Sequence, residues 1–149
     1  MEHPAAIFFS SSHPLFSMLN AEFVEAQSQV LGMKFVAQKE FVEHCASNQL
    51  HSGYCTIILD SVMGGAVMGA LGKLQPIATI NLTTQHIERA VLDEVIYCRA
   101  EVQSIENQMA VVRGSVRGSD NKRILASAVG SFMIGTRATP LKNVGGRLA

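Results

Sequence analysis

The stretch from residue 53 to residue 72 is apolar on every side, and Asp60 is its only charged residue. This length and composition predict a single helix that is buried on most sides. Small residues remove bulk from much of it and let another backbone approach closely; they are Gly64, Gly65, Ala66, Gly69 and Ala70. Because glycine inside a helix costs about 1 kcal/mol relative to alanine, we expect close packing to compensate. One sheet wrapped around this one helix would bury it.

The same stretch is long enough to cross a bilayer, so a membrane span has to be weighed. Asp60 would then lie near the middle of the membrane, at a cost of about 2.5–3.5 kcal/mol. The rest of the chain has the pattern of soluble strands, and we therefore expect no membrane partner. The formal net charge is zero, which provides no basic field for nucleic acid either.

The chain length of 149 residues fits a single domain. We place the core of this domain at residues 12–136, with terminal extensions at 1–11 and 138–149. The apolar content of 48% and charged content of 16% indicate a globular protein that can build its own core.

The three cysteines, Cys45, Cys55 and Cys98, show no C-x-x-C spacing, so neither a disulfide framework nor a zinc site is indicated. Cysteines used in this way fit a reducing compartment best. The N-terminus has no Lys or Arg ahead of its short apolar run, unlike a signal peptide. We expect a cytoplasmic protein that binds no metal.

Downstream of the helix, apolar and polar residues alternate as strands require. In the last such segment the residues expected to face inward are Ile124, Ala126, Ala128, Gly130, Phe132 and Ile134. The predicted elements are a helix at 12–27, a long strand or bent pair at 30–45, a polar loop at 46–52, the buried helix at 53–72, and strands at 77–87, 91–104, 108–118 and 123–135. Short turns between the last four strands imply antiparallel pairing. The predicted fold class is α+β, with a curved antiparallel sheet around one central helix.

Three motifs resemble those of the hotdog-fold acyl-CoA thioesterases, in particular the phenylacetate-degradation (PaaI-type) branch. His51-Ser52-Gly53 stands where that branch has His-Gly-Gly, and Asp60 follows His51 by nine residues. The strand that begins at Thr79 and the segment 122–134 are similar to the family's third and last strands. The resemblance covers residues 13–136 and implies the hotdog fold.

The resemblance implies hydrolysis of an acyl-CoA thioester, with no cofactor, since coenzyme A is part of the substrate. Asp60 would be the catalytic carboxylate, either as general base for water or as nucleophile. Backbone N–H groups near Ser52 and Gly53 would polarise the thioester carbonyl, and Thr79 would position the water. A helix N-terminus independently suits this role, because its N–H groups lack partners within the helix.

The resemblance also implies an assembly. Family members are homodimers or dimer-of-dimers tetramers in which the His51 loop and the Asp60 helix of one site come from different chains. The sequence departs from the family at Cys45, where asparagine is common, and Asn48 lies three residues later. We therefore include Asn48 among the candidate substrate-binding residues.

Several roles stay open at this point. His51 is either a loop-fixing hydrogen bonder or an acid–base group. A Cys–His nucleophile, built from Cys45 or Cys55 with His44 or His51, is disfavoured because buried cysteines are mostly small hydrophobes. Met63 is a candidate for the acyl pocket.

A cluster of cations is predicted across one hairpin, and it either contacts the coenzyme A phosphates or forms a solvated face. Its members are Arg113, Arg117, Lys122 and Arg123. The competing functions are a non-catalytic acyl-CoA-binding module, a hotdog hydratase or dehydratase, and a structural subunit in which Asp60 would have no purpose.

Overall fold

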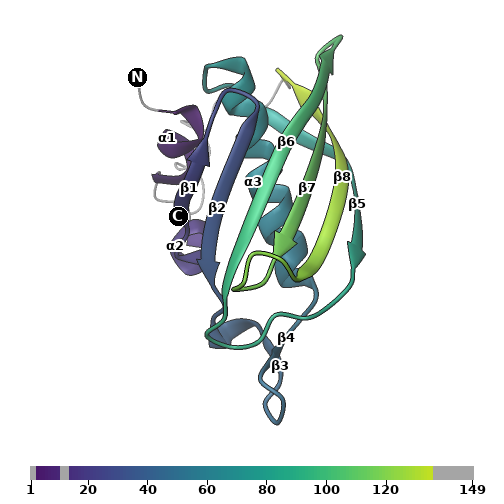
Figure 1. Ribbon diagram of the computed structural model, residues 1–149. Coiled ribbons are helices and arrows are strands. Elements are labelled where there is room, and N and C mark those ends of the chain that lie inside the picture. Colours follow the sequence, from purple (N-terminus) through teal and green to yellow (C-terminus); the bar gives the residue numbers. More distant parts are fainter. Residues whose placement is uncertain (1–2, 11–13, 136–149) are drawn as a thin grey trace, which may run out of the picture.

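The apolar helix lies in the middle of the molecule, and a six-stranded antiparallel sheet curves around it (Figure 1). The computed structural model describes residues 3–10 and 14–135. The strand order is β1-β2-β6-β7-β8-β5, and a second, two-stranded sheet pairs β3 with β4. The elements are α1 (Pro4–Ser10), α2 (Pro14–Leu19), β1 (Glu22–Ala26), β2 (Val30–Val36), a 3-10 helix (Lys39–Phe41), β3 (Val42–His44), β4 (Gln49–Leu50), α3 (Gly53–Leu71), β5 (Ile77–His86), β6 (Val95–Glu106), β7 (Met109–Arg117) and β8 (Ile124–Ile134). The predicted fold class is confirmed.

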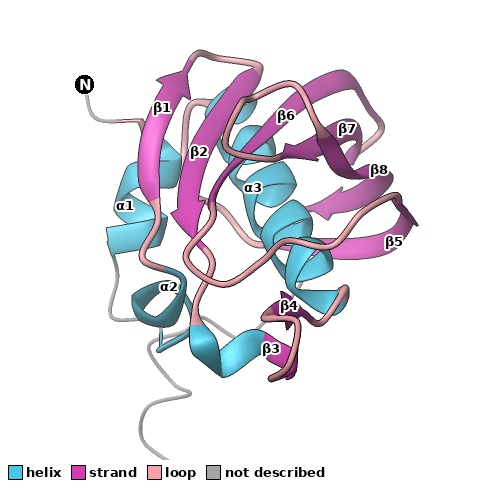
Figure 2. Ribbon diagram, turned by 60° about the horizontal axis from the view of Figure 1, so that its bottom comes forward, coloured by secondary structure: helices cyan, strands magenta, loops and turns pink. Residues whose placement is uncertain are grey.

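The central helix α3 ends where the sequence places its end, because Gly72 adopts a left-handed conformation with φ of 66°. Figure 2 shows α3 inside the curve of the sheet, with α1 and α2 on the side of β1. The sheet faces α3 with alternate residues of its strands; in β7 these are Ala110, Val112, Gly114 and Val116. This alternation confirms the predicted strands β6, β7 and β8.

The glycines of α3 let α1 and β2 pack directly on the helix backbone. A Cβ atom on Gly65 would lie 2.7 Å from Cδ2 of Leu31 and 2.9 Å from Cε2 of Phe9. A Cβ atom on Gly69 would overlap the imidazole ring of His3. The small residues therefore serve close packing, as the sequence predicted.

A pair of matched alanine substitutions measures this packing. Gly65→Ala and Gly64→Ala gain the same helix propensity, but a Cβ atom on Gly64 would meet its nearest neighbour, Phe132, at an ordinary 3.8 Å. Because overpacking costs about 1–3 kcal/mol, we expect the free energy of unfolding of Gly65→Ala to fall below that of Gly64→Ala by this amount. Urea denaturation measures both values, and equal stabilities would contradict the packing argument.

The N-terminal part of the chain corrects the first predicted helix. The helix predicted at 12–27 ends at Leu19, and residues 22–26 form strand β1, which pairs Phe23 with Met33 of β2. Pairing with the edge of the sheet favours the extended form for Phe23 and Val24, whose side chains suit strands. The predicted extension at 1–11 contains helix α1, while Ser12 and the tail at 138–149 lie outside the described residues.

The region at 30–45, predicted as one long strand or a bent pair, forms two strands that belong to different sheets. Strand β2 ends at Val36, and a 3-10 turn leads into β3. The polar loop predicted at 46–52 contains the two-residue strand β4. Pairing of β4 with β3 is a tertiary contact too short to leave a period in the sequence.

The strand β5 is an edge strand and does not pair with β6. Its partner is β8, as in the pair Thr83 and Val129, because the connection at residues 87–94 is too long for a hairpin turn. The other edge of β5 is open, and Ile80 is 49% exposed. Ile124, predicted to face inward, is 40% exposed, because the register shifts opposite Val116 and Arg117. The other predicted inward residues of β8 are buried.

The helix α3 is long and apolar enough to cross a bilayer by length and composition. In this fold, however, 61% of the most apolar 18-residue segment of the helix is buried inside the protein. The core helix of a soluble domain passes the same test, so burial accounts for the apolar sequence without a membrane.

Candidate active site

The carboxylate of Asp60 is fixed by a threonine on the open edge strand. Thr79 Oγ1 donates a hydrogen bond of 2.7 Å to Asp60 Oδ1. No described residue donates a hydrogen bond to the other oxygen, Oδ2. Asp60 is half-buried, and this second oxygen keeps its capacity to accept a hydrogen bond. Thr79 therefore contacts the carboxylate itself rather than only a water beside it.

Asp60 belongs to a half-buried stripe along α3. Its members are Gly53, Thr56, Ile57, Asp60, Ser61 and Gly64. Strand β5 runs antiparallel to this stripe: Thr79 meets Asp60, and His86 Nε2 lies 3.4 Å from Thr56 Oγ1. The sequence did not point to His86, because the bulge between Thr79 and Asn81 breaks the alternation of β5.

His51 caps the N-terminus of α3 with its own side chain. Its Nδ1 atom accepts a hydrogen bond of 2.9 Å from the backbone N–H of Gly53, and its carbonyl accepts one of 3.0 Å from Tyr54. The Nδ1 atom must be unprotonated to accept this bond. The contact supports the loop-fixing role for His51 over the acid–base role.

A carboxylate and a guanidinium flank His51 on its other side. Glu43 Oε1 lies 4.0 Å from His51 Nε2, and Glu43 forms an ion pair with Arg89. The hydrogen bond from Arg89 lowers the pKa of the Glu43 carboxyl. Neither Glu43 nor Arg89 stands in a recognisable motif, so only the structure identifies them.

The two predicted backbone donors differ in availability. The N–H of Gly53 is occupied by His51, whereas the N–H of Ser52 has no partner among the described residues. The Ser52 side chain makes no capping hydrogen bond either. Of the two predicted donors, the one left without a described partner is therefore the amide of Ser52.

One chain does not bring Asp60 to this donor. Gly53 and Asp60 are both on α3, and a rise of 1.5 Å per residue separates them by about 10 Å along the helix axis. A single reacting carbonyl needs both groups within hydrogen-bonding or bonding distance. Within one chain, Asp60 and the N-terminus of α3 are therefore too far apart to contact the same carbonyl group.

A groove of about 530 Å³ lies beside the first turns of α3 and reaches the N-terminus of the helix. Its apolar lining consists of Phe41, Val42, Tyr54 and Ile57, and its polar lining includes His51 and Thr56. Met63 does not line this groove. It is fully buried, and its Sδ atom packs against Gly114 on the inner face of the sheet.

Asn48 and Cys45 lie on the hairpin formed by β3 and β4, which projects beyond the end of the sheet (Figure 1). Asn48 has a φ of 54°, and its carbonyl accepts a hydrogen bond of 2.8 Å from the N–H of Leu92. The Asn48 side chain forms no hydrogen bond with another described residue. Its contact with substrate stays a prediction.

The four predicted cations have different surroundings. Arg113 and Arg117 point from β7 to the outer face of the sheet, away from α3. Arg123 binds Glu88 and Glu94, and the backbone of Lys122 is held by Asp120. The sheet therefore separates Arg113 and Arg117 from Asp60, and contact of any of the four with coenzyme A phosphates stays a prediction.

The cysteines offer no activated nucleophile. Burial raises the pKa of the Cys55 thiol to about 11 and also raises the pKa of Cys98. Cys45 is exposed on its hairpin. Within the described ranges, no group of three or more His, Cys, Asp or Glu side chains is placed to hold a metal ion.

Thiol labelling tests this assignment. Because thiolate is the reactive form, we expect an alkylating reagent at pH 8 to modify Cys45 in the folded protein and to spare Cys55 and Cys98. Peptide mass mapping identifies the modified residues. Rapid modification of Cys55 in folded protein would contradict its burial.

Comparison with known proteins defines the class. The family model of the Thioesterase superfamily matches residues 48–125, which include His51, Asp60 and Thr79. The chain belongs to the thioesterase superfamily. A search of curated proteins gives no match.

Solved structures of the same architecture confirm the hotdog fold. A thioesterase family protein from Silicibacter pomeroyi is 17% identical, with a TM-score of 0.79 over 89% of this chain and 96% of that chain. A hypothetical thioesterase from Streptococcus pneumoniae, solved with coenzyme A, is 14% identical, with a TM-score of 0.69 over 77% of this chain and 85% of that one. A Streptococcus mutans protein bound to acetyl-CoA is 13% identical, with a TM-score of 0.69 over 77% and 88%. Variants of the pneumococcal protein with an aspartate or a threonine replaced by alanine have also been solved.

Proposed function

We propose that this protein hydrolyses an acyl-CoA thioester with Asp60 as the catalytic carboxylate. The observation that carries the proposal is the 2.7 Å hydrogen bond from Thr79 to Asp60, which orients the only charge on α3 and leaves one oxygen free. Membership of the thioesterase superfamily supports it. So do the fold neighbours that hold coenzyme A or acetyl-CoA.

Two chemical routes are compatible with this geometry. As a general base, Asp60 removes a proton from water, and the hydroxide attacks the thioester carbonyl carbon. The C–S bond then breaks, and Asp60 returns the proton to the departing thiolate of coenzyme A. As a nucleophile, Asp60 displaces coenzyme A to form a mixed anhydride, which water then hydrolyses. In both routes negative charge develops on the acyl oxygen, and a backbone N–H aimed at it stabilises the transition state.

We propose that this donor is the amide of Ser52 from a second copy of the chain. The open edge of β5 lies beside the Asp60 stripe, and an unpaired edge strand invites pairing with another strand. A two-fold dimer would place two such sites symmetrically. A homodimer, or a tetramer of two dimers, is therefore the expected assembly.

The acyl group would occupy the groove next to Gly53 and Tyr54, since its lining is mostly apolar. The reaction needs only water and the groups of the chain, so we expect no cofactor. Membership of the PaaI-type branch stays a prediction, as does a cytoplasmic location.

A thiol-release assay tests the proposal. The purified protein is incubated with short, medium, long and aromatic acyl-CoAs, and free coenzyme A is measured spectrophotometrically. Turnover of at least one class is expected. If calorimetry detects binding of acyl-CoA but the assay detects no turnover, the non-catalytic binding module is favoured instead. The absence of both binding and turnover would refute the proposal.

A further inference from the structure

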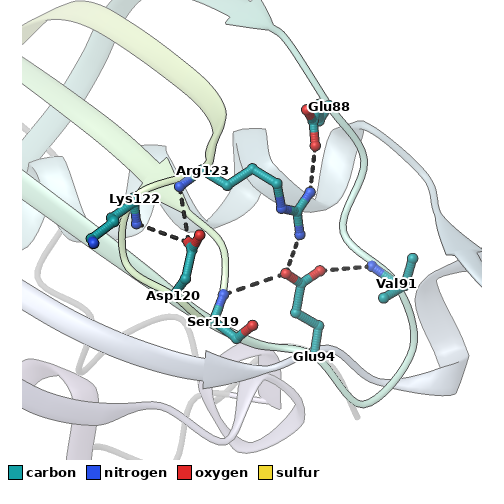
Figure 3. A network of polar contacts seen from close by, with 7 residues as sticks. All are labelled: Glu88, Val91, Glu94, Ser119, Asp120, Lys122 and Arg123. Carbon is teal, nitrogen blue, oxygen red and sulfur yellow. Dashed lines mark hydrogen bonds and ion pairs between the residues drawn. The ribbon is translucent and has the colours of Figure 1, made fainter.

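The connection between β5 and β6 carries a buried carboxylate that the proposed reaction does not use. The Glu94 side chain is only 6% exposed. It accepts hydrogen bonds from the backbone N–H groups of Val91, at 3.1 Å, and Ser119, at 3.4 Å, and it pairs with the guanidinium of Arg123 (Figure 3). Because a buried charge is costly without partners, these donors explain how Glu94 is tolerated.

Arg123 ties this connection to the turn between β7 and β8. Its guanidinium bridges Glu94 and Glu88, with 2.5 Å between Arg123 Nη1 and Glu88 Oε2. The turn itself is fixed by Asp120, whose Oδ1 atom accepts hydrogen bonds of 2.9 Å from the backbone N–H groups of Lys122 and Arg123 (Figure 3). Residues 87–94 are thus held against a rigid hairpin of the sheet.

The same connection holds the short strand that precedes α3. The N–H of Leu50 donates to the carbonyl of Ala90 at 2.9 Å, and Gln49 forms a bridge with Val91. Val91 is therefore held by Glu94 on one side and by β4 on the other. The chain continues from Leu50 through His51 directly to the amide of Ser52.

We propose that Glu94 and Arg123 are positioning residues for the Ser52 amide. Their ion pair fixes residues 87–94, which fix β4, which in turn sets the place of the N-terminus of α3. Since the Arg123 side chain is 37% exposed, this ion pair contributes little net stability. Its contribution here is directional, since the fork of Arg123 holds two carboxylates at defined angles. The kinetic consequence rests on the proposed function, whereas the structural consequence does not.

A matched pair of variants tests the inference. Arg123→Met removes the bridge, and Arg99→Met removes a similar bridge on the outer face, where Arg99 binds Glu25 at 3.2 Å and Glu101 at 3.0 Å without contacting β4. In Arg123→Met we expect amide hydrogen exchange in residues 49–55 to accelerate by about tenfold or more. Because a displaced donor weakens transition-state binding, kcat should fall about tenfold or more while KM stays within about threefold. Arg99→Met should change each quantity by less than about twofold.

A second variant keeps the test decisive if Arg123→Met does not fold. Arg123→Lys keeps the charge but cannot hold two carboxylates with one planar fork, so we expect intermediate exchange and an intermediate kcat. Wild-type exchange in residues 49–55 of a folded Arg123 variant would overturn the inference. So would an equal acceleration in Arg99→Met. Absence of turnover in the wild type would refute the proposed function, and the exchange data alone would then decide the positioning role.

Discussion

Replacement of Asp60 by asparagine is expected to lower kcat by about 10³-fold without loss of the fold. Asparagine keeps the shape of the side chain and can still accept the hydrogen bond from Thr79, but it cannot take a proton from water or attack a carbonyl carbon. The loss should therefore fall on kcat rather than on KM. Thiol release measures the rate, and thermal unfolding checks the fold.

Glu106→Gln provides the control for this prediction. It also removes one negative charge, but Glu106 is exposed at the end of β6. Its kcat should stay within about twofold of wild type, because surface substitutions of this kind have small effects. A folded Asp60→Asn protein that kept more than a tenth of wild-type kcat would remove Asp60 from the mechanism.

Mixing two inactive variants is expected to restore about a quarter of wild-type activity. One variant is Asp60→Asn, and the other is Ser52→Pro, which removes the proposed backbone donor. Ser52 has a φ of −57°, which suits proline, and its N–H has no described partner to lose. Alone, Ser52→Pro should lose about 10²–10³-fold in kcat, as other enzymes do when one oxyanion donor is removed.

The recovery follows from the two-chain site. In a statistical mixture about half of the dimers contain one chain of each kind, and each mixed dimer has one site with both an intact Asp60 and an intact Ser52. The two proteins are unfolded and refolded together, native mass spectrometry counts the mixed dimers, and thiol release gives the activity. Each variant refolded alone is the control. Mixed dimers as inactive as their parents would show that Asp60 and Ser52 do not act in one site across the interface.

The sequence was sufficient to predict the helix and strands that show a strong pattern of apolar and polar residues. The boundaries of α3 follow from its apolar composition and from Gly72, and the strands β6 to β8 follow from their alternation. Sequence patterns failed where tertiary contacts decide. Residues 22–26 form a strand because they pair with the edge of β2. No local sequence pattern indicates that β5 pairs with β8.

The candidate site was predictable to a similar degree. The resemblance led to Asp60 and Thr79, and the structure places the two in contact. The role of His51 depends on the hydrogen bond that its ring accepts from the N–H of Gly53. The position of Arg123 depends on its contact with Glu94, which is 29 residues away in sequence. Neither spacing nor charge counting reveals such pairs.

The packing of α1 against Gly65 has a consequence for N-terminal truncation of the protein. The matched family region begins at residue 48, after α1, α2 and the first three strands. A polypeptide that began at residue 48 would expose one side of the central helix to solvent. The exposed surface would include Gly65, against which Phe9 and Leu31 pack. Uncovered apolar surface of this kind promotes aggregation. The N-terminal segment is thus an integral part of the folding unit, although the family match does not include it.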